Sequence, residues 1–300
     1  MKNEIKTTKN VNEANAITHS GIFHADEVFA SVILSKLFGT ITVFRTYKVP
    51  EDVADKIVYD IGNGTLDHHM PEGNGVRENG IPYAAAGLVW KKYGKSICQN
   101  TPNPEWIWET IDKVLIQGID AVDNGVYPKI DYPASCMNIS SIIAGFNLAW
   151  DSDEDPDIYF EKACEFASQV FDNIFKNCIP KAKAKNDVEK AIENSKDHIM
   201  ILNHFMPCME YIFSSENYKA DDIWFVIYPS SRGGFNWQCV PDEPGSFGQR
   251  HPVPLEWKGL RDEILQKVTG VSDAIFCHKE GFIGSAQTLE GAIEMAKKAI

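Results

Sequence analysis

The sequence lacks an excess of positive charge. Its 300 residues contain 29 Lys and Arg against 42 Asp and Glu, which gives a formal net charge of −13. Proteins that coat nucleic acid usually present a broad basic surface, so we expect no tight binding of duplex DNA. A small electropositive cleft is still compatible with this charge, because two bound dications would add about four positive charges locally.

The chain also lacks a long apolar run and any paired cysteine motif. It has no stretch of eighteen apolar residues, so we expect no membrane-spanning helix. The first fifteen residues are polar and contain no arginine, which is unlike a secretory signal or a mitochondrial presequence, and we predict a cytoplasmic protein. The seven cysteines form no C-x-x-C pair, which favours reduced, mostly buried thiols over a zinc finger or a disulfide scaffold.

Segments typical of strands and helices alternate through the first half of the chain. Apolar and β-branched segments predict strands over 14–18, 41–44 and 56–61, and apolar residues at helical spacing predict helices over 26–37, 82–93 and 104–117. This alternation favours an α/β fold with a doubly wound, mainly parallel sheet, which we assign to residues 1–150. Ligands of such sheets gather at the carboxyl ends of the strands.

The second half of the chain is organised differently. An acidic turn at 151–156 leads into two predicted helices, 156–178 and 181–196, which are separated by Pro180 and form a helical linker over 151–197. Beyond it, strands are predicted over 223–228, 235–240, 274–278 and 282–285, and helices over 255–268 and 289–299. Paired strands with tight turns predict a smaller C-terminal α/β domain with a mixed sheet at 198–300.

Three potential metal ligands lie between the first predicted strand and the first predicted helix. They are His19, His24 and Asp26. Imidazoles and carboxylates mixed in this way suit a centre that holds two divalent ions. Taken alone, Asp26 is equally well explained as a helix N-cap, and a single loop histidine is usually structural. Three such groups within eight residues favour metal binding, and we predict all three as ligands.

A second group of ligands follows the strand that ends at Asp60. A carboxylate at the end of a buried strand is costly unless it is paired or metal-bound, so Asp60 is the candidate to bridge two ions. Next comes the tripeptide Asp67-His68-His69. Neighbouring side chains of an extended segment point in opposite directions, so we assign His68 to the metal and His69 to the substrate phosphate. We expect Asp67 to orient His68 through its ring N–H.

The last ligand is expected in the segment GIDAVDNG at 118–125. Asp123 is the preferred residue and Asp120 the alternative, although Asp123-Asn124-Gly125 is also a plain turn sequence. With nitrogen and oxygen ligands combined, we predict two divalent ions, with Mn²⁺ preferred and Mg²⁺, Co²⁺ or Zn²⁺ as alternatives.

Taken together, these motifs resemble the DHH-type phosphoesterases, and specifically their MYG branch of metal-dependent hydrolases. The resemblance covers nearly the whole chain through THSGIFHADE (18–27), VYDIGN (58–63), LDHHM (66–70), GIDAVDNG (118–125), VPDEPGSFGQRHPVPLEWKGLRDE (240–263) and FCHKEGFIG (276–284). It implies a manganese-type 3′–5′ RNA exonuclease whose second domain closes over the substrate. Related families carry an aspartate where this chain has His24, and their spacing from the first histidine is one residue shorter.

Two features of the second domain are candidates for substrate binding. Arg232, Gly233 and Gly234 follow two serines on a glycine turn that could hold a phosphate, although a simple hairpin turn explains them equally well. His278 ends a predicted strand ahead of Gly281 and is included on the family pattern; alone it is more often structural. Phe235 and Trp237 could stack a base, but a core role for one of them is the simpler interpretation.

These observations predict a metal-dependent phosphodiester hydrolase in which His69, Asp60 and Asp67 do the catalytic work. The expected substrate is a single-stranded RNA end or a short oligonucleotide. A pyrophosphatase-like hydrolase of a small phosphoanhydride keeps the same centre and changes the substrate. A non-catalytic metal-binding regulatory protein is the third hypothesis. A homo-oligomer is left open.

Overall fold

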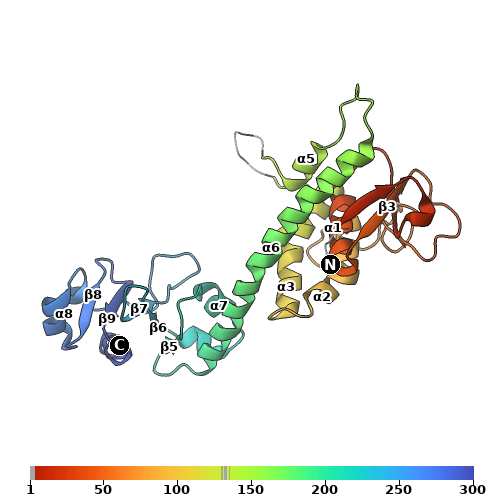
Figure 1. The fold of residues 1–300 in the computed structure, drawn as a ribbon. Helices are drawn as coiled ribbons and strands as arrows, with labels where there is room; N and C mark the ends of the chain where they lie inside the picture. The colour runs from red at the N-terminus through yellow and green to blue at the C-terminus, as the bar shows by residue number, and fades with distance from the viewer. Residues whose placement is uncertain (1–3, 130, 132–133, 135) are drawn as a thin grey trace. The chain divides into compact units, whose positions relative to one another are not determined.

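The computed structural model describes residues 4–129, 131, 134 and 136–300. The chain divides into two compact units, Met1–Pro180 and Lys181–Ile300 (Figure 1). Each unit contains its own sheet. This division falls inside the predicted helical linker, at neither 150 nor 198.

The first unit contains a four-stranded parallel sheet. Its strands are β1 (Ile5–Thr8), β2 (Ala16–His19), β3 (Ile41–Thr46) and β4 (Ile57–Val58), in the order β1-β3-β2-β4. The predicted parallel sheet is therefore confirmed, whereas β1 was not predicted. His19 ends β2 in register with Thr46 of β3, and Asp60 follows β4 by two residues. The predicted ligands thus start from the carboxyl ends of neighbouring strands.

Helix α1 (Ala25–Phe38) is the central helix of this unit. Every residue from Ala25 to Ser35 is buried, because α1 packs against both β3 and α2 (Ala85–Cys98). Along β3, Ile41, Val43 and Arg45 are buried while the alternating residues are only partly buried. Ala16, Ile17 and Thr18 of β2 are all fully buried, so the sheet is covered on both faces at this strand and less evenly at β3.

The remaining helices of the first unit run close to one another in sequence. Helix α3 (Pro104–Ile111) continues through a π-helical turn (Asp112–Ile116) into α4 (Gln117–Asp123), and α5 (Ile139–Ala144) follows. The predicted helix over 104–117 is therefore longer and contains an irregular turn. Asp123 is the last residue of α4, so its carboxylate lies at the C-terminus of a helix.

Helix α6 (Pro156–Glu193) contains Pro180 in its interior. The sequence predicted two helices that end and begin on either side of this proline. That prediction was wrong: although proline removes one helical hydrogen bond, the chain continues as one helix of 38 residues. Cys178, Ala182 and Ala184 are buried on either side of the proline, so packing supports the helix where local propensity does not.

The second unit contains the predicted mixed sheet. Its strands are β5 (Ile199–Ile201), β6 (Phe225–Pro229), β7 (Phe235–Cys239), β8 (Ala274–Cys277) and β9 (Ile283–Ala286), in the order β5-β6-β7-β9-β8. Only the β5–β6 pair is parallel. Helices α7 (Met209–Ser214), α8 (Asp262–Thr269) and α9 (Leu289–Ala299) complete it.

One sequence prediction for the second unit needs correction. The segment predicted as one helix over 255–268 is a 3₁₀ turn (Leu255–Trp257) followed by α8, with Gly259 at φ +79 between them. Trp237 is fully buried beside Met295, which agrees with the interpretation that one of the two aromatic residues Phe235 and Trp237 has a core role. None of the seven cysteines is in a disulfide, and of the seven only Cys136 is exposed. No helix in the described part of the chain is long and apolar enough to cross a membrane.

Candidate metal centre

Ligands from four segments converge at the carboxyl end of the parallel sheet. His19 comes from the end of β2, Asp26 from the first turn of α1, Asp60 and His68 from the loop after β4, and Asp123 from the end of α4. Short loops between strand and helix bring the first four together, and packing of α4 against α1 adds the fifth. The convergence predicted from the sequence is confirmed.

One group of carboxylates surrounds His68. Its Nε2 lies 3.3 Å from Asp60 Oδ1, 3.2 Å from Asp123 Oδ2 and 3.6 Å from Asp26 Oδ2. Ligand atoms bound at about 2.1 Å to one cation lie roughly 3.0–3.4 Å from each other. The oxygens of Asp60 and Asp123 are therefore spaced from His68 Nε2 as ligands of a single ion are, and that of Asp26 lies slightly farther away.

Asp60 connects this group to a second one. Its Oδ1 is 3.3 Å from His68 Nε2, and its Oδ2 is 3.2 Å from His19 Nε2. The backbone of Asp60 is in the left-handed region at φ 57, which is strained for most residues and is best tolerated by Asn, Asp and Gly. Its N–H is held by the carbonyl of Leu66. This strained turn directs one buried carboxylate to both groups, as a bridging ligand requires.

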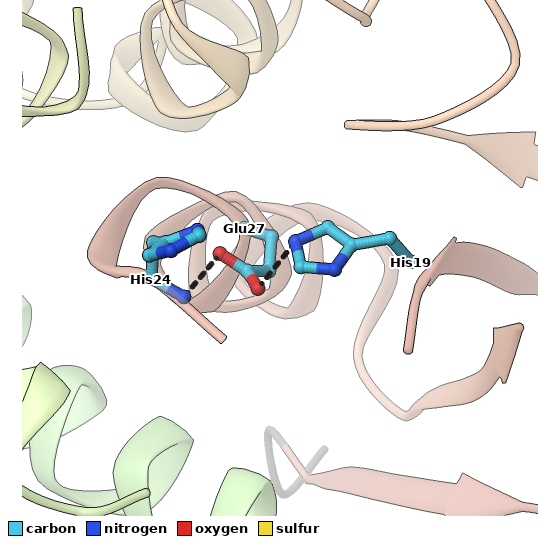
Figure 2. A group of neighbouring side chains, drawn as sticks. All are labelled: His19, His24 and Glu27. Atoms are coloured by element: carbon cyan, nitrogen blue, oxygen red, sulfur yellow. Dashed lines mark hydrogen bonds and ion pairs between the residues drawn. The ribbon is translucent and has the colours of Figure 1, made fainter. Parts of the chain in front are cut away.

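Glu27 belongs to the second group and was not predicted. It is fully buried in the first turn of α1, and Figure 2 shows its carboxylate between His19 and His24. Its Oε1 lies 2.8 Å from His19 Nε2, and its Oε2 accepts a hydrogen bond of 2.8 Å from the backbone N–H of His24. One ligand atom each from His19, His24 and Glu27 fit within 4.8 Å of one another. A glutamate three residues after a helix N-cap resembles a capping box. Because this pattern already explains Glu27 in the sequence, its position beside the two imidazoles could not be predicted from it.

Asp67 contacts His69 where the sequence predicted His68. Its Oδ1 is 2.8 Å from His69 Nδ1 and also accepts the backbone N–H of His69. Its Oδ2 accepts the N–H of Asn63. His68 contacts the carboxylates of Asp26, Asp60 and Asp123 instead, and Asp67 orients the ring of His69. His69 is 58% exposed in its side chain, whereas Asp67 is buried.

The choice between Asp120 and Asp123 is resolved by their neighbours. Asp120 is fully buried, its Oδ2 is 2.7 Å from Arg77 Nη1 and its Oδ1 accepts the N–H of Gly87. A Cβ on Gly87 would lie 1.8 Å from Asp120 Oδ2, so this contact requires glycine. Asp120 therefore joins α4 to the start of α2, while Asp123 reaches the centre.

Charges at the centre are strongly coupled. Burial lowers the pKa of His19, but contacts with Asp60 and Glu27 outweigh burial and raise it to about 11. Burial raises the pKa of Asp60, yet the hydrogen bonds from His19 and His68 lower it to about 2. The pKa of Asp26 is raised, first by burial and then by the charges of Asp60, Glu27 and Asp123. In the absence of metal, protons on the imidazoles offset part of the carboxylate charge.

The residues fit divalent cations. Three buried carboxylate oxygens at the centre, Asp26 Oδ1, Glu27 Oε1 and Asp60 Oδ1, accept no hydrogen bond of normal geometry, and the last two only face imidazole nitrogens of the centre. Buried carboxylate oxygens are seldom left without a partner, because the cost of removing them from water is high. Oxygens and imidazole nitrogens together are ligands that Mn²⁺ and similar ions accept. A cation in each group would satisfy the oxygens that the protein leaves open.

Comparison with known proteins places the chain in a family. A family model named MYG1_exonuc, described as uncharacterised protein family UPF0160, matches residues 15–300. The chain belongs to this family. It is 34% identical to the MYG1 protein of Dictyostelium discoideum over 94% of this chain and 95% of that protein. It is 30% identical to the MYG1 exonuclease of Homo sapiens, over 94% and 85% of the two chains. No solved structure matches the chain.

The residues predicted for substrate binding in the second unit lie apart from one another. Arg232, Gly233 and Gly234 are in the turn between β6 and β7, and His278 is in the turn between β8 and β9. Strand pairing sets these turns at opposite ends of the sheet, because Phe235 pairs with Ala286 and Gln238 with Ile283. Within the first turn, the N–H groups of Ser230, Arg232 and Gly233 are already used by the turn itself. A hairpin turn therefore accounts for this segment, and a substrate role for these four residues stays a prediction.

Two recesses of this family member border the metal centre. One, of about 520 Å³, is lined by Asp26, His68, Asp123 and Tyr127 among others. The other, of about 470 Å³, is lined by His19, Tyr47, Asn63 and Asp67 among others. His24, Asp60 and His69 line both. A larger recess of about 740 Å³ in the second unit contains none of the predicted site residues, so size alone does not identify the site.

Proposed function

We propose that this protein is a divalent-metal-dependent phosphodiester hydrolase that removes nucleotides from single-stranded nucleic acid. The observation that carries the proposal is the shared carboxylate of Asp60, whose two oxygens face His19 on one side and His68 on the other. From the contacts of His68 we assign Asp26, Asp60, His68 and Asp123 to one set of ligands. From the contacts of His19 we assign His19, His24, Glu27 and Asp60 to the other. Two carboxylate-bridged ions are typical of phosphoester hydrolases.

Cations held here would make a bound water acidic and neutralise charge on phosphoryl oxygens. The protein supplies the remaining groups. With its Nδ1–H donated to Asp67, the ring of His69 is fixed and its Nε2 is free to exchange a hydrogen bond with a phosphoryl or leaving oxygen. His69 borders both recesses, so it can reach a phosphate that lies across the centre.

The substrate class is inferred from the relatives and the charge. The relatives from mouse, rat and human are named MYG1 exonuclease, and each is 30% identical to this chain. The net charge of −13 disfavours a broad duplex-binding surface and is compatible with a single-stranded end entering a narrow site. We therefore propose a 3′–5′ exonuclease that acts on RNA, uses Mn²⁺ and shares the metal centre of DHH-type phosphoesterases.

The test is hydrolysis by metal-stripped protein to which Mn²⁺, Mg²⁺, Co²⁺ or Zn²⁺ is returned. The substrates are a single-stranded oligoribonucleotide, the matching oligodeoxyribonucleotide and pyrophosphate. We expect mononucleotides from the oligoribonucleotide with Mn²⁺ and no product without metal. Release of phosphate from pyrophosphate alone would instead assign the centre to a small phosphoanhydride.

Asp60→Asn is the decisive variant, because it removes the bridging charge and keeps a residue that tolerates φ 57. Asp52→Asn is a matched control: Asp52 has the same φ of 57 but is exposed and lines neither recess at the centre. We expect Asp60→Asn to abolish hydrolysis with an unchanged circular dichroism spectrum, and Asp52→Asn to retain it. Full turnover by folded Asp60→Asn would exclude the proposal.

A further inference from the structure

The recess beside His19 has an apolar rim above a polar floor. Its floor is formed by ligands of the metal centre, whereas Tyr47 and Ile22 stand at its edge with 83% and 71% of their surface exposed. Together the two side chains form a small apolar surface directly beside the polar floor. Such a surface suits a ligand with flat apolar faces that is attached to a charged group.

We propose that this recess binds the base of a nucleotide next to the scissile phosphate, and that Tyr47 is the surface on which the base stacks. The inference rests on the proposed function and names the part of the substrate that the site recognises. A base has two apolar faces and a polar edge, and stacking on an aromatic side chain accepts any base.

The position of Tyr47 supports a fixed platform. Tyr47 directly follows β3, and Thr46, the last residue of that strand, pairs with His19. Its ring lies against Gly21: a Cβ placed on Gly21 would be 3.4 Å from ring carbon Cε1 and from the hydroxyl oxygen. Gly21 has φ +94, which favours glycine, and its carbonyl accepts a hydrogen bond from Arg45. The backbone thus supports part of the ring and leaves most of it open to a ligand.

The lining of the recess also indicates where the phosphate does not bind. Among the described residues that line it, none is Lys or Arg, so it offers no cationic side chain for an anion. Negative charge of a substrate is then attracted to the metal centre, while the neutral base occupies the recess. Pyrophosphate, which has no apolar surface, would gain nothing from Tyr47 and Ile22.

Asn63 provides a polar group at the same recess. The backbone N–H of Asn63 donates to Asp67, which also holds the ring of His69. This hydrogen bond fixes Asn63 at the edge of the recess. An amide side chain can donate to or accept from the edge of a base or a sugar hydroxyl. The recess therefore combines a stacking surface with one amide, an arrangement that binds bases with little sequence preference.

The test compares Tyr47→Ala and Tyr47→Phe on two oligoribonucleotides, one complete and one whose terminal two residues lack bases. Trp150→Ala is the matched control, because Trp150 is 97% exposed in the same unit and lines neither recess. On the complete substrate we expect Tyr47→Ala to raise KM about 10-fold with kcat unchanged. Tyr47→Phe, which keeps the ring, and Trp150→Ala should behave as wild type. On the abasic substrate, Tyr47→Ala should match wild type, since no base is left to stack.

Equal KM values for wild type and Tyr47→Ala on the complete substrate would overturn the inference, as would an equal loss on both substrates. Fluorescence anisotropy of the two labelled oligonucleotides with metal-stripped protein gives the same comparison without turnover. If wild type hydrolyses neither oligonucleotide, the proposed function fails, and the anisotropy comparison then decides separately whether Tyr47 binds a base. Absence of binding to either oligonucleotide counts against the stacking surface.

Discussion

Replacing Glu27 by Gln tests whether this buried carboxylate belongs to the metal centre. Gln has nearly the same shape, and its side-chain oxygen can still accept the His24 N–H that Glu27 Oε2 accepts now. The substitution removes the negative charge of the Glu27 carboxylate, whose Oε1 lies 2.8 Å from His19 Nε2. The variant therefore separates the helix-capping role of Glu27 from its role toward a cation.

The expected magnitude follows from the position of the charge. Carboxylates that support a metal-bound imidazole typically contribute 10- to 100-fold to metal affinity. Glu27 is fully buried and faces two imidazoles, so we expect a loss of about 100-fold, or ~2.7 kcal/mol, in one of two Mn²⁺ binding steps. Because the capping bond is kept, the free energy of unfolding of the metal-free protein should change by less than about 1 kcal/mol.

Isothermal titration of Mn²⁺ into metal-stripped protein measures both steps. Asp123→Asn is the matched comparison, because Asp123 contacts His68 in the other ligand set. We expect Glu27→Gln to weaken one step and Asp123→Asn the other. Two unchanged binding steps in a folded Glu27→Gln protein would refute the assignment and leave Glu27 as a helix cap only.

Two further predictions follow from the neighbours of the centre. Asp120→Asn should keep both Mn²⁺ binding steps, because Asp120 faces Arg77 and Gly87, whereas Asp123→Asn should lose one. Isothermal titration calorimetry measures both steps. Loss of a step in folded Asp120→Asn would contradict this prediction. The pKa of His19 is raised from 6.5 to about 11, so its stabilisation of the metal-free protein is complete below pH 6.5 and is lost as pH rises toward 11. Thermal unfolding should therefore show that the metal-free protein loses stability from pH 6.5 to 9. The Mn²⁺-loaded protein and a metal-free His19→Gln variant should lose less stability over the same range. An equal change of stability with pH in all three proteins would contradict the prediction.

Local sequence patterns were sufficient for much of the fold. Apolar spacing predicted α1, and the structure confirms it within one residue at each end. The β6–β7 and β8–β9 pairs were likewise predicted from strand-like segments separated by glycine turns. The error at Pro180 has a physical cause: a proline costs one hydrogen bond locally, and burial of Cys178, Ala182 and Ala184 around it compensates for that loss.

The sequence by itself determined which ligand types are present and that they follow strand ends. His19, Asp60 and His68 could be predicted because parallel strands bring their carboxyl ends to one edge. The neighbours of each side chain could not be predicted in this way. Glu27 and Asp26 are adjacent in the first turn of α1, and both carboxylates are buried at the centre, one toward His19 and the other toward His68.

Only the tertiary structure decided between Asp120 and Asp123. Both are aspartates in one short helix, three residues apart, and nothing local distinguishes them. Arg77 comes from a distant loop and Gly87 from the first turn of α2, and together they occupy the carboxylate of Asp120. The physical reason is that a buried carboxylate is directed by whatever neutralises it, and here those partners lie more than thirty residues away in the chain.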